Sequence, residues 1–131
     1  MKGFVEDIED LTEKNDDFRH VLYTGKHLQL VLMSLKPGEE IGSEAHRDRD
    51  QFFRIEKGKG QILIDDKTQE IKSGDAMVVP AGSRHNVIIT GDKFLKLYTI
   101  YGPPNHLDQL VEVTKAETLV SKEIFAGAIT E

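Results

Sequence analysis

The sequence has no cysteine among its 131 residues. This absence excludes disulfide bonds, zinc sites built from thiolates, and thiol nucleophiles. If the chain binds a metal, the ion must therefore be held by nitrogen and oxygen donors. A search for ligands can be restricted to histidine, carboxylate and amide side chains.

Long apolar runs and an excess of positive charge are missing as well. No stretch approaches the roughly 18 consecutive apolar residues of a membrane span, and the acidic segment 1–10 lacks the apolar core of a secretion signal. Lys and Arg number 17 against 23 Asp and Glu, for a formal charge of -6. Surfaces that bind nucleic acid need clustered positive charge instead. We therefore expect a cytoplasmic protein that binds neither membranes nor nucleic acid, and whose partner is a small-molecule ligand.

The apolar residues that are present favour short alternating runs rich in β-branched side chains. Turn signals such as Pro37-Gly38, Asp65-Asp66 and Gly91-Asp92 separate these runs. This rhythm is typical of an all-β sandwich or barrel. We predict strands at 18–24, 28–35, 51–56, 61–65, 69–72, 76–79, 85–89, 94–101 and 110–113.

The length fits a single domain, residues 1–131, with the barrel core at about 18–113. The acidic segment 1–17 is expected to be a solvated edge or a turn of helix. In the tail 114–131, Thr114 and Glu117 match a capping box, which predicts a helix from about Lys115 to Phe125. The alternative is a frayed tail. The predicted helix would pack on the barrel or on a second subunit through Ala116, Leu119, Val120 and Ile124.

Two spaced patterns carry the chemistry of the chain. The first is Gly38, Glu44, His46, Gln51 and Gly58, and the second is Gly74, Pro80, Gly82 and His85. Both spacings resemble the two motifs of the cupin family, and 15 residues separate the patterns, as in compact single-domain members. With its flanking strands, the resemblance covers about residues 18–104. It implies a cupin-type double-stranded β-helix, or jelly-roll barrel, with a mononuclear metal site.

Strand geometry explains why such a pattern makes a site. Alternate residues of a strand face the same side, so Glu44 and His46 both point into a barrel while Ala45 points out. On the same argument Gln51 faces inward at the start of the next strand, and His85 faces inward after the turn at Pro80. The four side chains are therefore expected to meet near one end of an apolar barrel, in a pocket of the kind that binds small ligands.

The chain departs from the common cupin pattern at two predicted ligands. Glu44 stands where many cupins have the first histidine, and Gln51 stands where they have a glutamate. The resulting set of two imidazoles and one carboxylate favours divalent iron or manganese, with nickel, zinc and copper as alternatives. Gln51 adds only a weak neutral oxygen, so we expect weaker binding than in a site with three histidines. Asp48 or Asp50 would replace a ligand if the loop bends differently.

Several other residues are candidates for the pocket. His106, in the loop after the last long strand, is expected either at the pocket mouth or simply in the loop. Gly58-Lys59-Gly60 is interpreted as a hairpin turn between two strands, and Arg54 is expected to point outward. The remaining candidates are aromatic, aliphatic or Met residues at strand spacing, for which a plain core role is the alternative: Met33, Phe53, Ile55, Val87, Tyr98 and Tyr101.

The function that these features favour is a small metal-binding cupin that binds or transforms an oxygen-rich organic metabolite. If it is an enzyme, dioxygenase-like or sugar-isomerase-like chemistry at the metal is expected, and the sequence assigns no catalytic residue. A non-catalytic sensory module and a vestigial structural dimer are the alternatives. The outward apolar Phe52 and the apolar tail lead us to expect a homodimer. No nucleophile elbow is present, which disfavours a serine triad.

Overall fold

The computed structural model describes residues 2–120 and 123–131, which contain ten strands and two short helices. Their bounds are α1 Ile8–Lys14, β1 Arg19–Thr24, β2 Gln29–Leu35, β3 Glu44–Ala45, β4 Asp50–Lys57, β5 Lys59–Ile64, β6 Lys67–Lys72, β7 Ala76–Val79, β8 Arg84–Ile89, β9 Leu95–Gly102, β10 Val111–Glu112 and α2 Lys115–Val120. Each predicted strand has a counterpart within two residues. The two-residue strand β3 has none.

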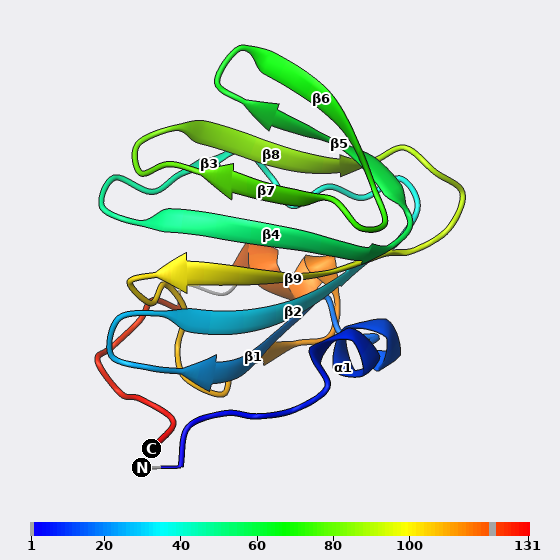
Figure 1. Ribbon diagram of the computed structural model, residues 1–131. Helices are drawn as coiled ribbons and strands as arrows, with labels where there is room; N and C mark the ends of the chain where they lie inside the picture. Colours follow the sequence, from blue (N-terminus) through cyan, green and yellow to red (C-terminus); the bar gives the residue numbers. More distant parts are fainter. Residues whose placement is uncertain (1, 121–122) are drawn as a thin grey trace.

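The strands form two antiparallel sheets that face each other (Figure 1). The larger sheet has the order β10-β1-β2-β9-β4-β7, and the smaller has the order β3-β8-β5-β6. Some neighbours in the sheets are distant in sequence, as the pairing of β2 with β9 and of β3 with β8 shows, whereas β1 and β2, and β5 and β6, follow each other along the chain. This arrangement is the all-β jelly roll that the cupin resemblance implied.

The core lies between the sheets and follows the alternation of inward and outward side chains. In β4, Gln51, Phe53 and Ile55 are buried while Phe52 and Arg54 are more exposed, as predicted. Burial of a large aliphatic or aromatic side chain contributes about 1.5–3 kcal/mol relative to exposure. The strands of both sheets therefore hold the barrel together through one shared apolar layer.

Gly58 marks a corner rather than the predicted hairpin turn. Strands β4 and β5 on either side of it belong to different sheets, and they do not pair with each other. Gly58 has φ +95°, and a Cβ atom there would lie 2.6 Å from the carbonyl oxygen of Phe94. Only glycine fits where the chain crosses so closely over the neighbouring strand. The hairpin interpretation was wrong because the strands on either side of Gly58 pair with other strands, β4 with β7 and β9, and β5 with β6 and β8.

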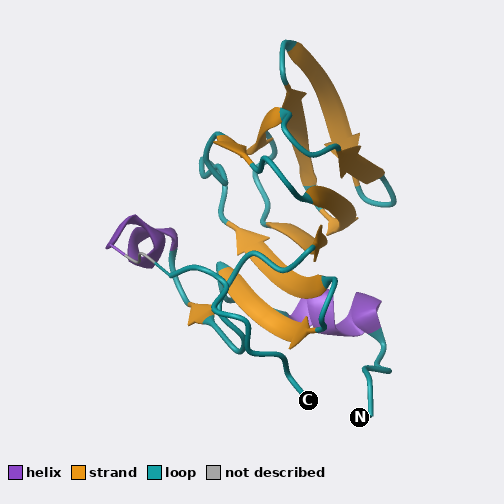
Figure 2. Ribbon diagram, turned by 90° about the vertical axis from the view of Figure 1, so that its left-hand side faces the viewer, coloured by secondary structure: helices purple, strands orange, loops and turns teal. Residues whose placement is uncertain are grey.

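The helix α1 covers the outer face of the larger sheet, where it contacts β2, β4 and β9. The Asp7 carboxylate caps it by accepting from the Asp10 N–H at 3.1 Å. Just beyond the helix, Lys96 of β9 bonds the Asp16 carboxylate at 2.9 Å. Figure 2 shows α1 and α2 on opposite sides of this sheet. The acidic segment thus contains a short helix, one of its two predicted forms.

The C-terminal helix is shorter than predicted. It is described from Lys115 to Val120, and residues 123–125 are not helical. Residues 121–122 and the side chains of Leu119 and Val120 lie outside the described part of the chain, so most of the predicted apolar face does too. Its remaining members, Ala116 and Ile124, are exposed. The Glu117 carboxylate accepts from the Val113 N–H at 2.9 Å, which closes the start of the helix.

The two ends of the chain lie side by side (Figure 1). The Glu131 carboxylate accepts from the backbone N–H groups of Lys2 and Gly3, each at 2.8 Å. The Thr130 N–H donates to the carbonyl oxygen of Thr24, the last residue of β1, at 2.9 Å. No helix within the described ranges has the length and apolar character needed to cross a membrane.

Candidate metal centre

The short strand β3 positions the first candidate ligand. It pairs antiparallel with β8 so that Glu44 stands directly opposite His85 and Ala45 stands opposite Arg84. Directly opposed residues in an antiparallel pair have their side chains on the same face, about 5 Å apart at Cβ. The ladder between β3 and β8 therefore brings the Glu44 carboxylate and the His85 imidazole together.

His46 joins this pair from the residue just beyond β3. Its Nε2 atom lies 3.0 Å from the Oε2 atom of Glu44, and its ring centroid lies 5.5 Å from that of His85. Its carbonyl accepts from the Gly82 N–H at 2.7 Å, which ties the first motif to the turn of the second. One ligand-capable atom from each of Glu44, His46 and His85 lies within 4.8 Å of the others.

The environment holds His85 in the form that a metal requires. Burial lowers the pKa of its imidazole, although the hydrogen bond to Ser83 opposes that shift. Its Nδ1 atom lies 3.3 Å from the Ser83 carbonyl oxygen, so we assign the proton to Nδ1. The Nε2 lone pair is then left for an ion. Histidines that bind metals typically donate their other ring N–H in this way, to a backbone carbonyl or a carboxylate.

Glu44 is held as a carboxylate. Burial favours its neutral form, but the hydrogen bond and charge of His46, together with the Arg19 guanidinium, lower the pKa of Glu44 below its usual value. Its side chain remains 34% exposed, against 13% for His46. The Glu44 carboxylate is therefore the ligand through which the cluster meets solvent.

Gln51, the fourth predicted ligand, is buried at the start of β4. Its Nε2 donates to the Thr99 hydroxyl at 2.9 Å, while its Oε1 atom is buried without a hydrogen-bond partner. Gln51 is the register partner of Tyr101, whose ring lies 5.7 Å from that of His46. The amide oxygen thus lies beside the cluster, and its role as a ligand stays a prediction.

The donor set fits a divalent cation. The Gln51 amide oxygen is buried without a hydrogen-bond partner, and the buried Nε2 atom of His46 lies against the Glu44 carboxylate. A buried polar atom without a partner costs about 1–3 kcal/mol, and a bound ion would remove that cost. Two imidazoles and a carboxylate, with a neutral oxygen beside them, are nitrogen and oxygen donors of the kind that divalent metals take in proteins.

A hollow of about 450 Å³ opens beside Glu44 and His46. His106 lies on its wall, as the prediction of a place at the pocket mouth requires, and is only 7% exposed. One of its ring nitrogens contacts the Glu123 carboxylate, and the other lies 3.2 Å from the Tyr101 hydroxyl. Burial and the Glu44 charge raise the pKa of Tyr101, so this hydroxyl stays protonated.

Sequence reasoning missed several residues that line this hollow. They are charged groups from β1, β10, α2 and the C-terminal segment: Arg19, Glu112, Lys115 and Glu123. Arg19 shares the inward alternation of Val21, and this was the one signal that the sequence offered. The others lie outside both motifs and reach the hollow only through the fold.

The other predicted pocket residues fall into two groups. Tyr98 was placed wrongly, since it lies on the outer face of the larger sheet with its ring 6.2 Å from that of Phe52. The rest belong to the core, and the Phe53 ring lies 6.1 Å from that of His85. Asp48 and Asp50 take no part in the cluster, because Asp48 pairs with Arg49 and Asp50 accepts from the Ala81 N–H. Of the predicted pocket-lining residues, those that are fully buried in the core are Met33, Phe53, Ile55 and Val87.

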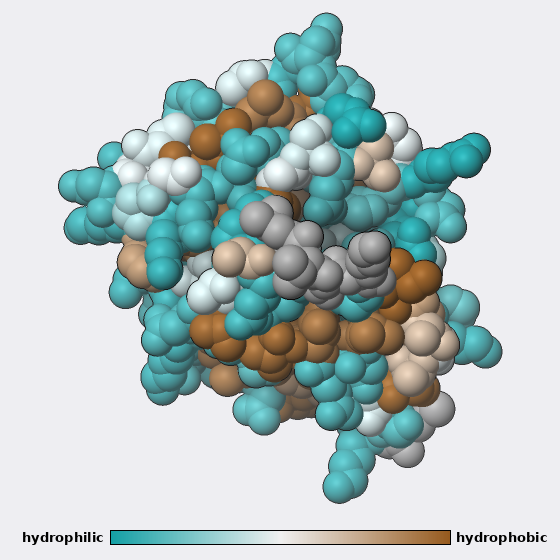
Figure 3. Space-filling view, turned by 180° about the vertical axis from the view of Figure 1, so that it is seen from behind, coloured by the Kyte–Doolittle hydropathy of each residue, from teal (hydrophilic) through white to brown (hydrophobic). Residues whose placement is uncertain are grey.

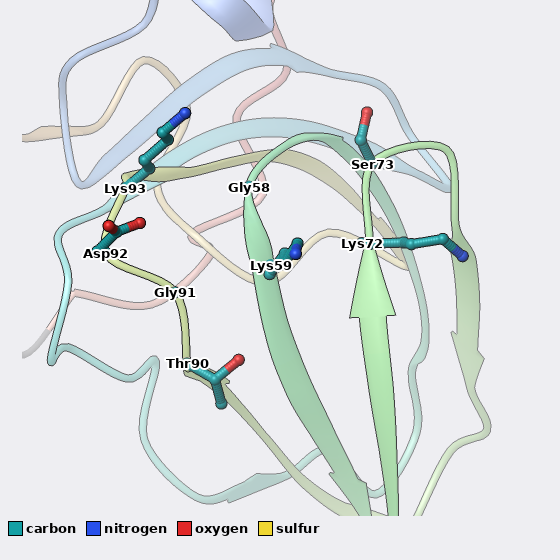
Figure 4. Close-up of a pocket in the computed structure, with 8 residues that line it drawn as sticks. All are labelled: Gly58, Lys59, Lys72, Ser73, Thr90, Gly91, Asp92 and Lys93. Atoms are coloured by element: carbon teal, nitrogen blue, oxygen red, sulfur yellow. The ribbon is translucent and has the colours of Figure 1, made fainter.

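A larger depression, of about 620 Å³, lies at the opposite end of the barrel beside Gly58. Figure 4 shows that the Lys72 and Lys93 side chains on its rim do not converge, since Lys72 points out to the right and Lys93 points upward. Its lining combines backbone with exposed side chains and includes no histidine. We therefore place the candidate site at the Glu44 cluster, where polar groups converge.

Comparisons with known proteins agree with the fold and with the motifs. Residues 31–101 match the family model of the cupin domain. The uncharacterized protein YrkC of Bacillus subtilis is 45% identical over 128 residues, which cover 93% of this chain and 69% of that protein.

Solved structures give the same result. A crystal structure from Bacillus halodurans is 43% identical and has a TM-score of 0.90, with 92% of this chain and 96% of that chain covered. A predicted oxalate decarboxylase from Thermotoga maritima is 26% identical, with a TM-score of 0.57 and coverage of 60% and 68%.

Proposed function

The chain belongs to the cupin family, and we propose that it is a metal-binding cupin that holds a small oxygen-rich organic metabolite at a mononuclear divalent ion inside the barrel. The observation that carries this proposal is the Glu44, His46 and His85 cluster, whose ligand-capable atoms lie within 4.8 Å of one another. The buried amide oxygen of Gln51, which has no hydrogen-bond partner, supports it independently.

Glu44, His46 and His85 would hold the ion, with Gln51 as a neutral fourth donor. Divalent iron or manganese suits two imidazoles and one carboxylate, and open positions would remain for ligand oxygens. When bound, such an ion acts as a Lewis acid toward ligand oxygen atoms, and iron in addition supports dioxygen chemistry. Either role is compatible with an isomerase or an oxygenase.

The residues around the cluster give it a fixed geometry. The Ser83 carbonyl orients the His85 ring, and Tyr101 packs edge-on against His46. The hydroxyl of Tyr101 faces His106, which in turn contacts Glu123 at the wall of the hollow. A bound metabolite would therefore contact rigidly held metal ligands on one side and hydrogen-bonding groups at the mouth of the hollow.

Metal analysis tests the proposal. The full chain, purified without chelators and then reconstituted with Mn²⁺ or Fe²⁺, is expected to hold one ion per chain by mass spectrometry of the metal. His46→Ala and His85→Ala are each expected to reduce the content to less than about a tenth, because removal of one of three strong donors costs several kcal/mol.

His27→Ala is the matched control, since His27 is exposed and lies outside both motifs. It is expected to bind metal like the wild type. A wild-type chain that takes up no divalent ion after reconstitution, or metal binding that survives both cluster variants, contradicts the proposal.

We propose a homodimer as the form in which the protein acts. Hydrophobic residues gather in a band on the face that carries α2 (Figure 3). Val111 of the edge strand β10 is 44% exposed and the adjacent Val113 is 55% exposed. Light scattering is expected to give twice the chain mass of 14.8 kDa, and a double change of these valines to lysine is expected to halve it. Val78→Lys, on the other edge strand, is the control, and a monomeric wild type contradicts the dimer.

A further inference from the structure

Two cations line the hollow beside the metal cluster. Arg19 comes from β1 and Lys115 from the first residue of α2. The Cζ atom of Arg19 lies 5.4 Å from the centre of the Phe18 ring, and the Nζ atom of Lys115 lies 5.3 Å from the same ring. Two positive groups from distant parts of the sequence therefore lie against the same aromatic ring.

Arg19 is built into this wall. Its side chain is 7% exposed, its Nη1 donates to the Glu112 carboxylate at 2.5 Å, and its Nε atom is buried without a hydrogen-bond partner. Burial opposes the charge of the guanidinium, but the negative groups around it, Glu112 and Glu44 among them, raise its pKa. Arg19 is thus a fixed cation with unused donor capacity.

Lys115 supplies a second charge, which the carboxylates of Glu40, Glu44 and Glu39 favour from a distance without pairing with it. Its Nζ donates to the Ile41 carbonyl at 2.5 Å, and no carboxylate of the described residues lies within 4 Å of it. Burial, and after it the Arg19 charge, lowers the pKa of Lys115. Arg19 and Lys115 thus bring two positive groups to this end of the hollow, and only Arg19 forms an ion pair there.

The acidic groups of the hollow are already engaged. Glu112 pairs with Arg19, Glu123 contacts His106, and Glu44 belongs to the metal cluster. Among the positive groups of the hollow, the Lys115 ammonium has no carboxylate within 4 Å and the Arg19 Nε–H has no hydrogen-bond partner, while on the acidic side one carboxylate oxygen of Glu123 is also without a partner. Charge-assisted hydrogen bonds to a carboxylate are the interactions that such donors make best.

We propose that the hollow binds a short organic dicarboxylate, with one carboxylate at Lys115 and Arg19 and the other end facing Glu44, His46 and His85. This inference rests on the proposed function and names the class of its ligand. The volume of about 450 Å³ is within the range of small-molecule pockets, roughly 300–1,000 Å³. A sugar without an acidic group would leave the Lys115 ammonium without a carboxylate partner.

Calorimetric titration of the full chain with malonate, succinate and glutarate tests this ligand class. The Mn²⁺-loaded wild type is expected to bind at least one of them more tightly than the neutral diamide of the same length. Lys115→Met is expected to weaken that binding by about tenfold, the effect of one charge-assisted hydrogen bond. Lys115→Arg is expected to retain most of the affinity, because it keeps the charge.

Lys93→Met, at the opposite depression, is the matched control and is expected to leave the affinity unchanged. Manganese content and thermal unfolding are measured for every variant, and Lys115→Gln replaces Lys115→Met if the latter does not fold. Affinity that is the same in the wild type and the folded Lys115 variant overturns the inference. So does a wild type that binds none of the three acids.

The same titration on the metal-free chain separates this inference from the proposed function. Dicarboxylate binding that depends on Lys115 is expected there too, although more weakly. If the wild type takes up no metal yet shows this dependence, the metal proposal fails and the anion subsite stands. If it binds metal but shows no dependence on Lys115, the subsite fails and the metal proposal stands.

Discussion

The two ends of the barrel are built from the same strands and yet differ in kind. Near its start, strand β4 carries the buried amide of Gln51, and farther along it carries the buried Ile55; β8 likewise carries His85 near its start and Ile89 at its end. In Figure 1 the polar starts of both strands lie at the left and their apolar ends at the right. The same strands thus hold a polar cluster at one end of the barrel and buried apolar side chains at the other.

The two ends of the barrel differ in the kind of side chain that they bury. At the apolar end, Ile55, Leu95 and Leu97 are fully buried hydrocarbon. At the polar end, the Nε2 atom of His46 is buried against the Glu44 carboxylate, and Gln51 buries an amide oxygen that has no hydrogen-bond partner. Such an unpartnered atom costs about 1–3 kcal/mol in the metal-free chain. The apolar end therefore supplies stability, and the polar end is kept at a cost that a bound ion would remove.

The largest expected effect is at the apolar end. Ile55→Ala should lower the free energy of unfolding by about 3 kcal/mol, because it leaves a cavity in a fully packed layer. Urea denaturation of the metal-free chain measures this loss. Ile100→Ala, on the outer face of β9 and only partly buried, should cost less than half as much. Metal content per folded chain should stay at the wild-type level in both variants, and its loss in Ile55→Ala would break the division between the two ends.

A smaller effect of opposite kind is expected at the polar end. Gln51→Glu places a carboxylate where a neutral oxygen now lies beside the cluster, and it should tighten metal binding by about tenfold, since affinity rises with ligand charge. The metal-free chain should become less stable, because a second carboxylate is buried near Glu44. Chelator competition and urea denaturation measure the two effects. Gln69→Glu, on an exposed strand, should change neither, and unchanged metal affinity in Gln51→Glu would exclude Gln51 as a ligand.

Side-chain alternation in the sequence predicted which residues line the two ends of the barrel, but not how the strands pair. Alternation of side chains identified the inward faces of β4 and β8, because burial in a strand has a period of two. It also put Ile55 and His85 on those faces correctly. The same alternation does not show which strands pair, and the corner at Gly58 was therefore taken for a hairpin.

The wall of the hollow was beyond sequence reasoning for a related reason. Arg19, Glu112 and Lys115 lie outside both motifs and meet only after β1, β10 and α2 are placed together. The strand β3 is two residues long and exists only through its ladder with β8. Local patterns thus predict which side chains point inward, whereas contacts between distant segments have no local signature.

The smallest expected effect concerns pH, and it belongs to the polar end alone. Burial lowers the pKa of His85 in the folded chain below the ordinary value of 6.5. As the pH falls below 6.5, the unfolded chain takes up this proton before the folded chain does. Stability is therefore fully present above pH 6.5 and decreases toward acid, by at most about 1.4 kcal/mol per pH unit from this group. Glu44, whose pKa is lowered from 4.5, adds a loss only at still lower pH.

Urea denaturation of the metal-free chain at pH 7.5, 6.5 and 5.5 measures this slope. His85→Gln should flatten it, while His27→Gln, at an exposed position, should leave it as in the wild type. Ile55→Ala should lower the whole curve without changing its shape, because the side chain that it truncates does not titrate. A slope that persists in His85→Gln would mean that the pH response arises elsewhere, and the two ends would then not divide stability and protonation between them.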